Sequence, residues 1–272
     1  MNSAFQFCIS RRLLLASIIS FLFLTALTGS SAIQGRNLYL QHSFLSTDQK
    51  LTAQPCSQGL IHNAGRIGLA VNNLGMIGSG WPDSFLDKVI WGIPPSCQYP
   101  YPGDKEYLYI GALWVGAVLG DDTLVSVGID GWQMTREMWP DTCPDGVMRE
   151  LSIYGGDSGA ISEQDYIAVY TDTLTNPSYV IPDPFDGRPH IPLKLEVTQK
   201  SYAWSNPEAD DFVIFDFRIK NIGTDLLEDV YIGYYVDGDV KLKSPSTGFE
   251  DDICGLEQAE TRGSAAFRLS LH

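Results

Sequence analysis

The chain has 272 residues, of which 44% are hydrophobic, so it can bury a sizeable core in one large domain or two small ones. Its mean hydropathy of -0.04 excludes a membrane bundle. Lys and Arg number 18 against 33 Asp and Glu, a formal charge of -15, and a chain this acidic repels the phosphate backbones of nucleic acids.

The first 32 residues are predicted to be a secretory signal peptide. Arg11 and Arg12 supply the positive charge, and Leu13–Leu27 is an unbroken run of apolar or small residues. That run suits a signal peptide and is short for a membrane span. Small residues at Ser30–Ala32 offer a cleavage site. An uncleaved anchor is the alternative, but we expect an exported protein with no membrane span in its mature chain.

The cysteines fit an exported chain. Cys8 leaves with the signal peptide, and four cysteines remain: Cys56, Cys97, Cys143 and Cys254. An even number in an exported chain suggests up to two disulfides with three possible connectivities. Order along the chain favours Cys56–Cys97 with Cys143–Cys254, and four unpaired buried thiols are the alternative. None of the four stands in a spacing that suits zinc.

The first half of the mature chain is predicted to form strands separated by many turns. Residues 33–58 are polar and without a period, and we expect an irregular arm or linker there, followed by a β-rich domain over 59–180. Glu106–Leu119 is apolar on both faces, as a central sandwich strand would be. Gly120–Asp122 is a tight turn, from which Thr123–Ile129 returns as a hairpin. Weaker signals are strand candidates at Arg66–Val71 and Tyr166–Tyr170 and a turn-rich segment over 76–105, which contains the YPYPGD of Tyr99–Asp104.

Strict alternation begins after the proline-studded loop Pro182–Pro192. Apolar residues then recur at every second position in three runs: Leu193–Thr198, Val213–Lys220 and Val230–Val236. This period is typical of half-buried antiparallel strands, and it predicts an immunoglobulin-like β-sandwich region over 181–255. Residues 256–272 lack the pattern and are expected to be a tail. Such a tail is what a fragment that stops inside a domain would have. The predicted fold class is all-β, with one or more antiparallel immunoglobulin-like β-sandwiches after the signal peptide.

Five segments resemble a known group of proteins: HNAGRIGLAVNNLGMIGSG (62–80), EYLYIGALWVGAVLGDDTLVSVG (106–128), ISEQDYIAVYTDT (161–173), DPFDGRPHIPLKLEVTQKSYAWS (183–205) and DDFVIFDFRIKNIGTDLLEDVYIGYYVDGDV (210–240). They are similar to the N-terminal β-rich region of large secreted, multi-module bacterial proteins, which often end in immunoglobulin-like or secretion-sorting modules. The resemblance implies a secreted, β-rich surface protein of unknown activity, and it implies no catalytic residue.

One segment resembles a catalytic motif. Gly156–Gly159 reads GDSG, similar to the nucleophile motif of trypsin-like proteases, with Ser158 as the nucleophile. That chemistry needs a histidine base, which precedes the serine in those enzymes. The upstream histidines, His42 and His62, stand in no recognisable base motif, so an ordinary glycine-rich turn is the favoured interpretation. Downstream of the motif, His190 lies in a proline-rich loop, and the sequence contains no HExxH zinc motif.

Acidic residues near the end of the chain are the candidate metal ligands. The candidate calcium ligands are Asp237, Asp239, Asp251 and Asp252. Carboxylates in flexible loops suit calcium, although Lys241 falls where an EF-hand-like loop would have a further Asp or Asn. A solvated acidic edge is the alternative interpretation. A second, weaker acidic cluster comprises Glu208, Asp210 and Asp211.

Two tryptophans are the candidate ligand-binding residues. Trp132 and Trp139 lie in a turn-rich region, and exposed indole rings can stack on sugars. The favoured alternative is that both fill the end of the sandwich, because large aromatic side chains are usually well buried. Trp114 lies within a predicted strand and is expected in the core. Paired carboxylates for glycoside hydrolysis cannot be selected by spacing among 33 acidic residues.

The sequence therefore favours a secreted, non-catalytic β-sandwich region of a larger extracellular or cell-surface protein, with a structural, adhesive or ligand-presenting role. Its expected partners are other modules of the same chain, cell-surface components or polysaccharide, and no nucleic acid. The alternatives are a carbohydrate-binding accessory module and an extracellular hydrolase with an unrecognised active site. Calcium is the one cofactor that the sequence suggests.

Overall fold

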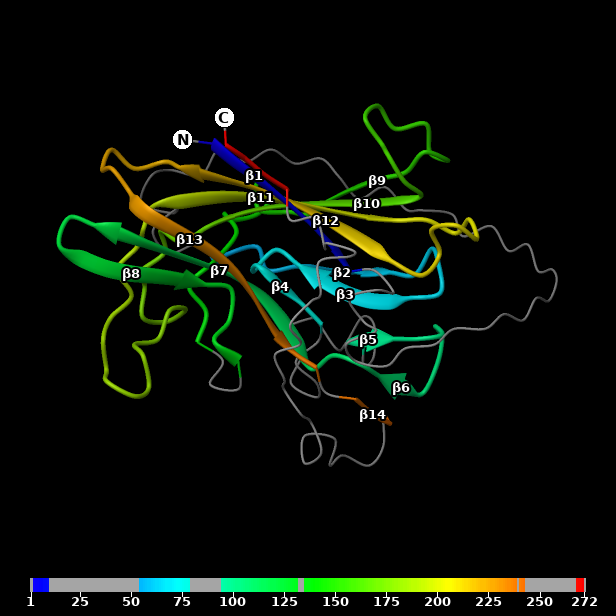
Figure 1. Cartoon of the computed structure of the whole chain (residues 1–272), viewed down its shortest axis with the longest axis horizontal. Coiled ribbons are helices and arrows are strands. Elements are labelled where there is room, and N and C mark those ends of the chain that lie inside the picture. Colours follow the sequence, from blue (N-terminus) through cyan, green and yellow to red (C-terminus); the bar gives the residue numbers. More distant parts are fainter. Residues whose placement is uncertain are drawn as a thin grey trace, which may run out of the picture.

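The described part of the chain consists of antiparallel β-sheets (Figure 1). In this computed structural model the described residues are 2–9, 54–78, 94–131, 135–238, 240–242 and 268–271, and they contain no helix. The predicted all-β, antiparallel fold is confirmed. Across these ranges, no helix long and apolar enough for a membrane span is found.

The strands form two sheets, which lie one above the other in Figure 1. The first sheet has the order β15 (Arg268–Leu271), β1 (Asn2–Ile9), β12 (Val213–Asn221), β11 (Leu195–Ala203), β10 (Gln164–Thr171) and β9 (Arg149–Leu151). The second has the order β13 (Glu228–Asp237), β7 (Ile110–Leu119), β4 (Met76–Ile77), β3 (Gly68–Asn72), β5 (Cys97–Gln98), β6 (Lys105–Glu106) and β14 (Lys241–Leu242), with β2 (Gly59–His62) beside β3 and β8 (Asp122–Val127) beside β7.

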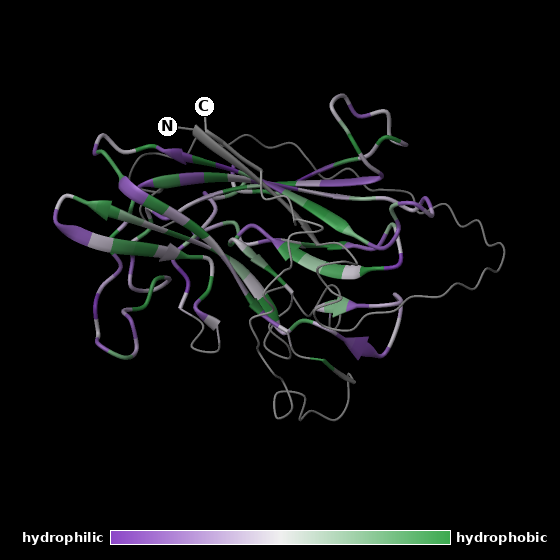
Figure 2. Ribbon diagram, viewed as in Figure 1, coloured by the Kyte–Doolittle hydropathy of each residue, from purple (hydrophilic) through white to green (hydrophobic). Residues whose placement is uncertain are grey.

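Alternation in β11 and β12 builds one side of the core, as the sequence predicts. Phe215 and Phe217 are fully buried, whereas Arg218 and Lys220 are exposed. Figure 2 shows the apolar residues recurring along these strands. The facing sheet contributes Leu69, Leu113 and other apolar side chains to the same cluster. The two predicted strands thus bury one face each, and the buried faces of the two sheets form the main core of the protein.

The chain changes sheet between β12 and β13. β13 pairs with β7 of the second sheet, so the connection over 222–227 crosses between the sheets. Ile232 and Tyr234 pack against the main core from this opposite side, and the rings of Tyr234 and Phe217 lie 5.8 Å apart. The alternation predicted for this run holds only at its centre, because Val230 and Val236 are 50% and 55% exposed.

The predicted hairpin is confirmed, with β7 and β8 paired as far as Leu119 and Asp122. β7 is covered on both faces: Leu113 packs in the main core, and Ile110 packs in a second cluster on the other side of the sheet. Trp114 was expected in the core, but it is only partly buried at the margin of that second cluster. Its ring stacks on Tyr235 at 5.6 Å, and its Nε1 donates to the carbonyl of Ile129 at 2.7 Å.

The two predicted β regions share both sheets. β10 of region 59–180 pairs with β11 of region 181–255 from Gln164 to Thr171. The predicted boundary near residue 180 therefore falls within one sheet. β1 lies within the predicted signal peptide and pairs with β12, and β15 lies within the predicted tail. Cleavage of the first 32 residues stays a prediction.

The predicted disulfide pairing is wrong, although a disulfide is present. Cys56 is bonded to Cys143, because the isolated bridge between Pro55 and Thr142 places these segments side by side. Cys97 lies on β5, where it is buried in the main core as a free thiol. Burial, aided by the nearby Glu106 carboxylate, raises the pKa of Cys97 to about 12, so this thiol is unreactive at neutral pH. Cys254 lies outside the described residues.

Candidate functional site

A cavity opens at the end of the sandwich where β2 lies near β9 and β10. Its volume is about 410 Å3, within the range of small-ligand sites. The side chains that give it chemical character are Asn63, Gln98, Tyr101, Glu150, Gln164 and Tyr166. They come from the β2–β3 turn, the segment around β5, and the β9–β10 pair, so only the folded sandwich brings them together.

Two tyrosine rings line the cavity, and both are held from behind. Tyr101 packs directly on the backbone of Gly68, where an added Cβ would come within 2.1 Å of the ring. The ring of Tyr166 stacks on His62 at 4.3 Å, and its hydroxyl donates to the carbonyl of Ile61 at 2.9 Å. Burial raises the pKa of Tyr166, so its hydroxyl stays protonated. Both rings are therefore fixed before any ligand binds. Tyr166 is only 4% exposed, whereas Tyr101 is half-buried, so Tyr101 is the ring on which a ligand can pack.

Side-chain amides are fixed in the same way. Gln164 accepts from the backbone N–H groups of Asn63 and Ala64 at 2.8 and 2.9 Å, and donates to Asn63 Oδ1 at 2.7 Å. On the opposite wall, Gln98 donates to Glu106 Oε1 at 2.6 Å and accepts from Gly103 N at 3.3 Å. Glu150 is exposed at the edge of the cavity. Gln98 is only 1% exposed, so the hydrogen-bonding groups that the cavity presents to a ligand are those of Asn63, Gln164 and Glu150.

Glu106 anchors the wall that carries Gln98. Its side chain is fully buried, and it accepts from the backbone N–H groups of Ser96 and Cys97 at 3.0 and 3.1 Å. A buried carboxylate is tolerated where several donors satisfy it. Glu106 therefore fixes the short strands β5 and β6, and through Gln98 it fixes the shape of the cavity.

His62 supports the cavity from inside the core. It is fully buried, and its Nε2 lies 2.7 Å from Ser201 Oγ. Burial lowers the pKa of His62 to about 3, so the ring is neutral at physiological pH. Ser201 is itself only 1% exposed, which places this pair out of reach of a substrate.

The GDSG segment forms an exposed loop between β9 and β10. Asp157 accepts from the backbone N–H of Ser152 at 3.0 Å, and Ala160 N donates back to the carbonyl of Asp157 at 3.1 Å. Ser158 lies on the surface, whereas the upstream His62 is buried and hydrogen-bonded to Ser201. His42 lies outside the described residues. The loop has the local hydrogen bonds of an ordinary turn.

His190 is built into a buried contact away from the cavity. Its Nδ1 lies 3.0 Å from Glu137 Oε1, and its Nε2 lies 2.7 Å from the carbonyl oxygen of Asp172. Burial alone lowers the pKa of His190, but Glu137 and Asp172 outweigh burial, and the net effect is a raised pKa. The side chain is 2% exposed, so its evident role is to join the 182–192 loop to the segment before Trp139.

The other predicted site residues do not meet at the cavity. Trp139 is 9% exposed and lies in the second cluster, with Tyr179 edge-on at 5.6 Å and Arg136 above its ring at 5.8 Å. Trp132 lies outside the described residues, so sugar binding by the two tryptophans stays a prediction.

The calcium ligands also stay a prediction. Asp237 ends β13, and its Oδ2 lies 3.4 Å from the hydroxyl of Tyr235. Asp239, Asp251 and Asp252 lie outside the described residues. Within the described ranges, no three His, Cys, Asp or Glu side chains gather as a metal site.

Sequence reasoning missed the cavity residues because they lie in segments with weak patterns. Tyr101 stands in the YPYPGD segment, which was expected only to make turns. Tyrosines interleaved with prolines were the available signal, since proline restricts the backbone and holds neighbouring rings in place. Gln98 and Gln164 carried no comparable signal.

Comparisons with protein-family models, with curated proteins and with solved structures found no match.

Proposed function

We propose that this chain is a non-enzymatic, extracellular binding module of a larger surface protein, and that the cavity binds a neutral saccharide. The observation that carries the proposal is the composition of the cavity wall: the fixed, partly exposed ring of Tyr101, the paired amides of Asn63 and Gln164, and the exposed carboxylate of Glu150.

Sugars match such a wall. The C–H face of a pyranose is apolar and packs on aromatic rings, while its hydroxyls need amide and carboxylate partners. The formal charge of -15 repels anionic ligands at long range, and Glu150 repels them at the cavity itself. Neutral sugars therefore fit better than uronic acids or phosphorylated ligands.

Export and the immunoglobulin-like form of the sandwich are parts of the same proposal. The Cys56–Cys143 disulfide supports an oxidising compartment, and the charged, apolar and small-residue segments at the start of the sequence support secretion. Strands that cross between two packed antiparallel sheets support an immunoglobulin-like arrangement. In this setting the module would act in adhesion, beside other modules of the same protein.

Binding is favoured over hydrolysis by the carboxylates. Among the described residues of the cavity wall, Glu150 is the one carboxylate, whereas most glycosidases use a pair across the bond that is cleaved. The buried Glu106 is engaged by the backbone and by Gln98. The Tyr101 ring and the amides of Asn63 and Gln164 can hold a sugar without a second acid.

The test is retention on insoluble neutral polysaccharides, together with a glycan array, for the processed protein and its variants. Tyr101→Ala should weaken binding about 5- to 10-fold, the loss of one ring contact of roughly 1–1.5 kcal/mol. Tyr231→Ala is the matched control, because Tyr231 is 74% exposed on β13 of the second sheet. Absence of retention, or equal losses in the two variants, would refute the cavity as the binding site.

A further inference from the structure

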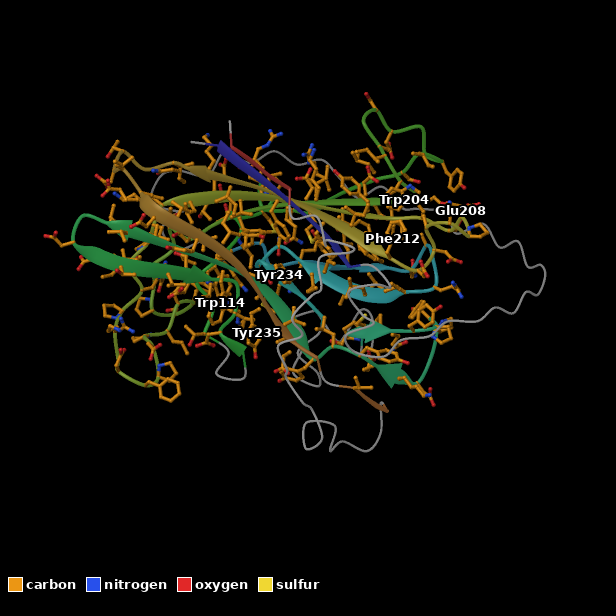
Figure 3. All side chains as sticks on the ribbon, viewed as in Figure 1. Trp114, Trp204, Glu208, Phe212, Tyr234 and Tyr235 are labelled. Carbon is orange, nitrogen blue, oxygen red and sulfur yellow. A yellow bond between two sulfur atoms is a disulfide. The ribbon has the colours of Figure 1, made fainter. Side chains whose placement is uncertain are left out.

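A group of aromatic side chains lies outside the cavity at the same end of the sandwich. Trp204 follows β11 and Phe212 precedes β12, so the pair closes the loop between these strands. Their ring centroids lie 5.9 Å apart, and Tyr202 extends the group at 6.3 Å from Trp204. Figure 3 shows Trp204, Phe212 and Glu208 together, well separated from Trp114 and Tyr235.

Glu163 joins this aromatic group to the exposed loop after β9. Its Oε1 accepts from Ser205 N at 3.1 Å, from Ser205 Oγ at 2.7 Å and from the hydroxyl of Tyr154 at 3.2 Å. Tyr154 is 77% exposed, yet its hydroxyl is held. A held, exposed ring loses little further rotamer entropy when a ligand packs on it.

The aromatic group is adjacent to the cavity. Glu163 precedes Gln164, which lines the cavity wall. The turn that carries Asn63 packs its next residues on the 204–212 loop: a Cβ at Gly65 would come within 2.6 Å of Trp204 O, and Arg66 N donates to Asp210 O at 2.7 Å. The salt bridge between Arg66 and Asp210, at 3.1 Å, fixes the same contact.

We propose that Tyr154, Trp204 and Phe212, with Glu163 between their two loops, form a second sugar subsite, so that one neutral polysaccharide chain is held by the cavity and by this group together. This inference rests on the proposed saccharide binding at the cavity. The ligand class follows from similar chemistry at both places: a partly or largely exposed ring for a sugar face, which is Tyr101 at the cavity, and a carboxylate for hydroxyls, which is Glu150 at the cavity and Glu163 here. A chain that contacts both places binds more tightly than a short piece, because the second contact is intramolecular.

The test is calorimetric titration of the processed protein with neutral hexasaccharides of glucose, xylose, mannose and N-acetylglucosamine, and with the matching disaccharides. Tyr154→Ala should weaken hexasaccharide binding about 5- to 10-fold and change disaccharide binding less than about 2-fold. Tyr101→Ala should weaken both. Phe185→Ala is the matched control, because Phe185 is also 77% exposed but lies in the 182–192 loop. Trp204→Ala is the second variant, and its hexasaccharide affinity is compared with that of the wild type once equal melting temperatures show that it is folded.

Two failures can be told apart. If hexasaccharide binding of Tyr154→Ala and Trp204→Ala equals that of Phe185→Ala, or if the wild type binds hexasaccharide and disaccharide equally, the second subsite is refuted while the cavity stands. If the wild type binds no sugar of either length, the cavity and the second subsite are both refuted.

Discussion

The β10–β12 region and the segment from residue 54 to Ile110 build opposite sides of one core by different means. In β11 and β12, apolar residues alternate with polar ones along strands of nine residues each. In the described residues of the other segment, the strands before Ile110 have two to five residues, and buried polar side chains bind the backbone between them. Asn73, for example, donates to the carbonyls of Cys56 and Gly146. The comparison teaches that long, regular strands bury apolar side chains by alternation, whereas the short strands are held by buried polar groups; the cavity lies where the two regions meet and takes residues from both.

The largest expected effect tests the regular region. Phe217 is fully buried and contacts both Phe215 and Tyr234. Phe217→Ala should lower the free energy of unfolding by about 3–5 kcal/mol, since it removes a large apolar side chain and leaves a cavity. Urea unfolding measures the loss. Arg218→Ala, on the exposed face of the same strand, should stay within about 0.5 kcal/mol, and similar losses in both variants would contradict the sandwich core.

The next effect tests the irregular region. The Cys56–Cys143 disulfide closes a loop with a sequence separation of 87 residues. Its reduction should cost about 2–5 kcal/mol of unfolding free energy, because the unfolded chain gains freedom. Thermal unfolding with and without reductant measures this. The Cys56→Ser/Cys143→Ser variant should be less stable and insensitive to reductant; a reductant effect that persists in it would argue for a different pairing.

The smallest effect tests the junction of the two regions, where His62 of β2 contacts Ser201 of β11. Burial lowers the pKa of His62 to about 3, so the unfolded state binds a proton more readily than the folded state below the usual pKa of about 6.5. Stability is then complete above that value and falls as the pH drops below it. Between pH 7 and 5 the titration of His62 should by itself lower the unfolding free energy by about 2 kcal/mol.

His62→Phe keeps a ring against Tyr166 and removes the titration, so its pH dependence should be shallower. His190 acts in the opposite sense, because its raised pKa adds stability as the pH falls, and both proteins contain it. Urea titrations at pH 7 and pH 5 give the change in unfolding free energy for the wild type and for His62→Phe. Equal slopes would show that His62 is not buried as a neutral ring.

The scaffold was predictable from the sequence and the candidate site was not. The alternation at Leu195 and Val197 and the turn at Gly120 are local signals, and each produced the expected strand or hairpin. The disulfide depended on the contact of Pro55 with Thr142, which no local pattern reveals. The cavity likewise needs Tyr101, Gln98 and Tyr166 from separate segments, and each is an ordinary residue until folding brings it to the others.

The most direct measurement is a crystal structure of the processed protein soaked with a neutral hexasaccharide that it retains. The account predicts a sugar ring packed on Tyr101, with its hydroxyls near Glu150, Asn63 and Gln164. Sugar bound only elsewhere on the protein, with the cavity holding solvent alone, would contradict it.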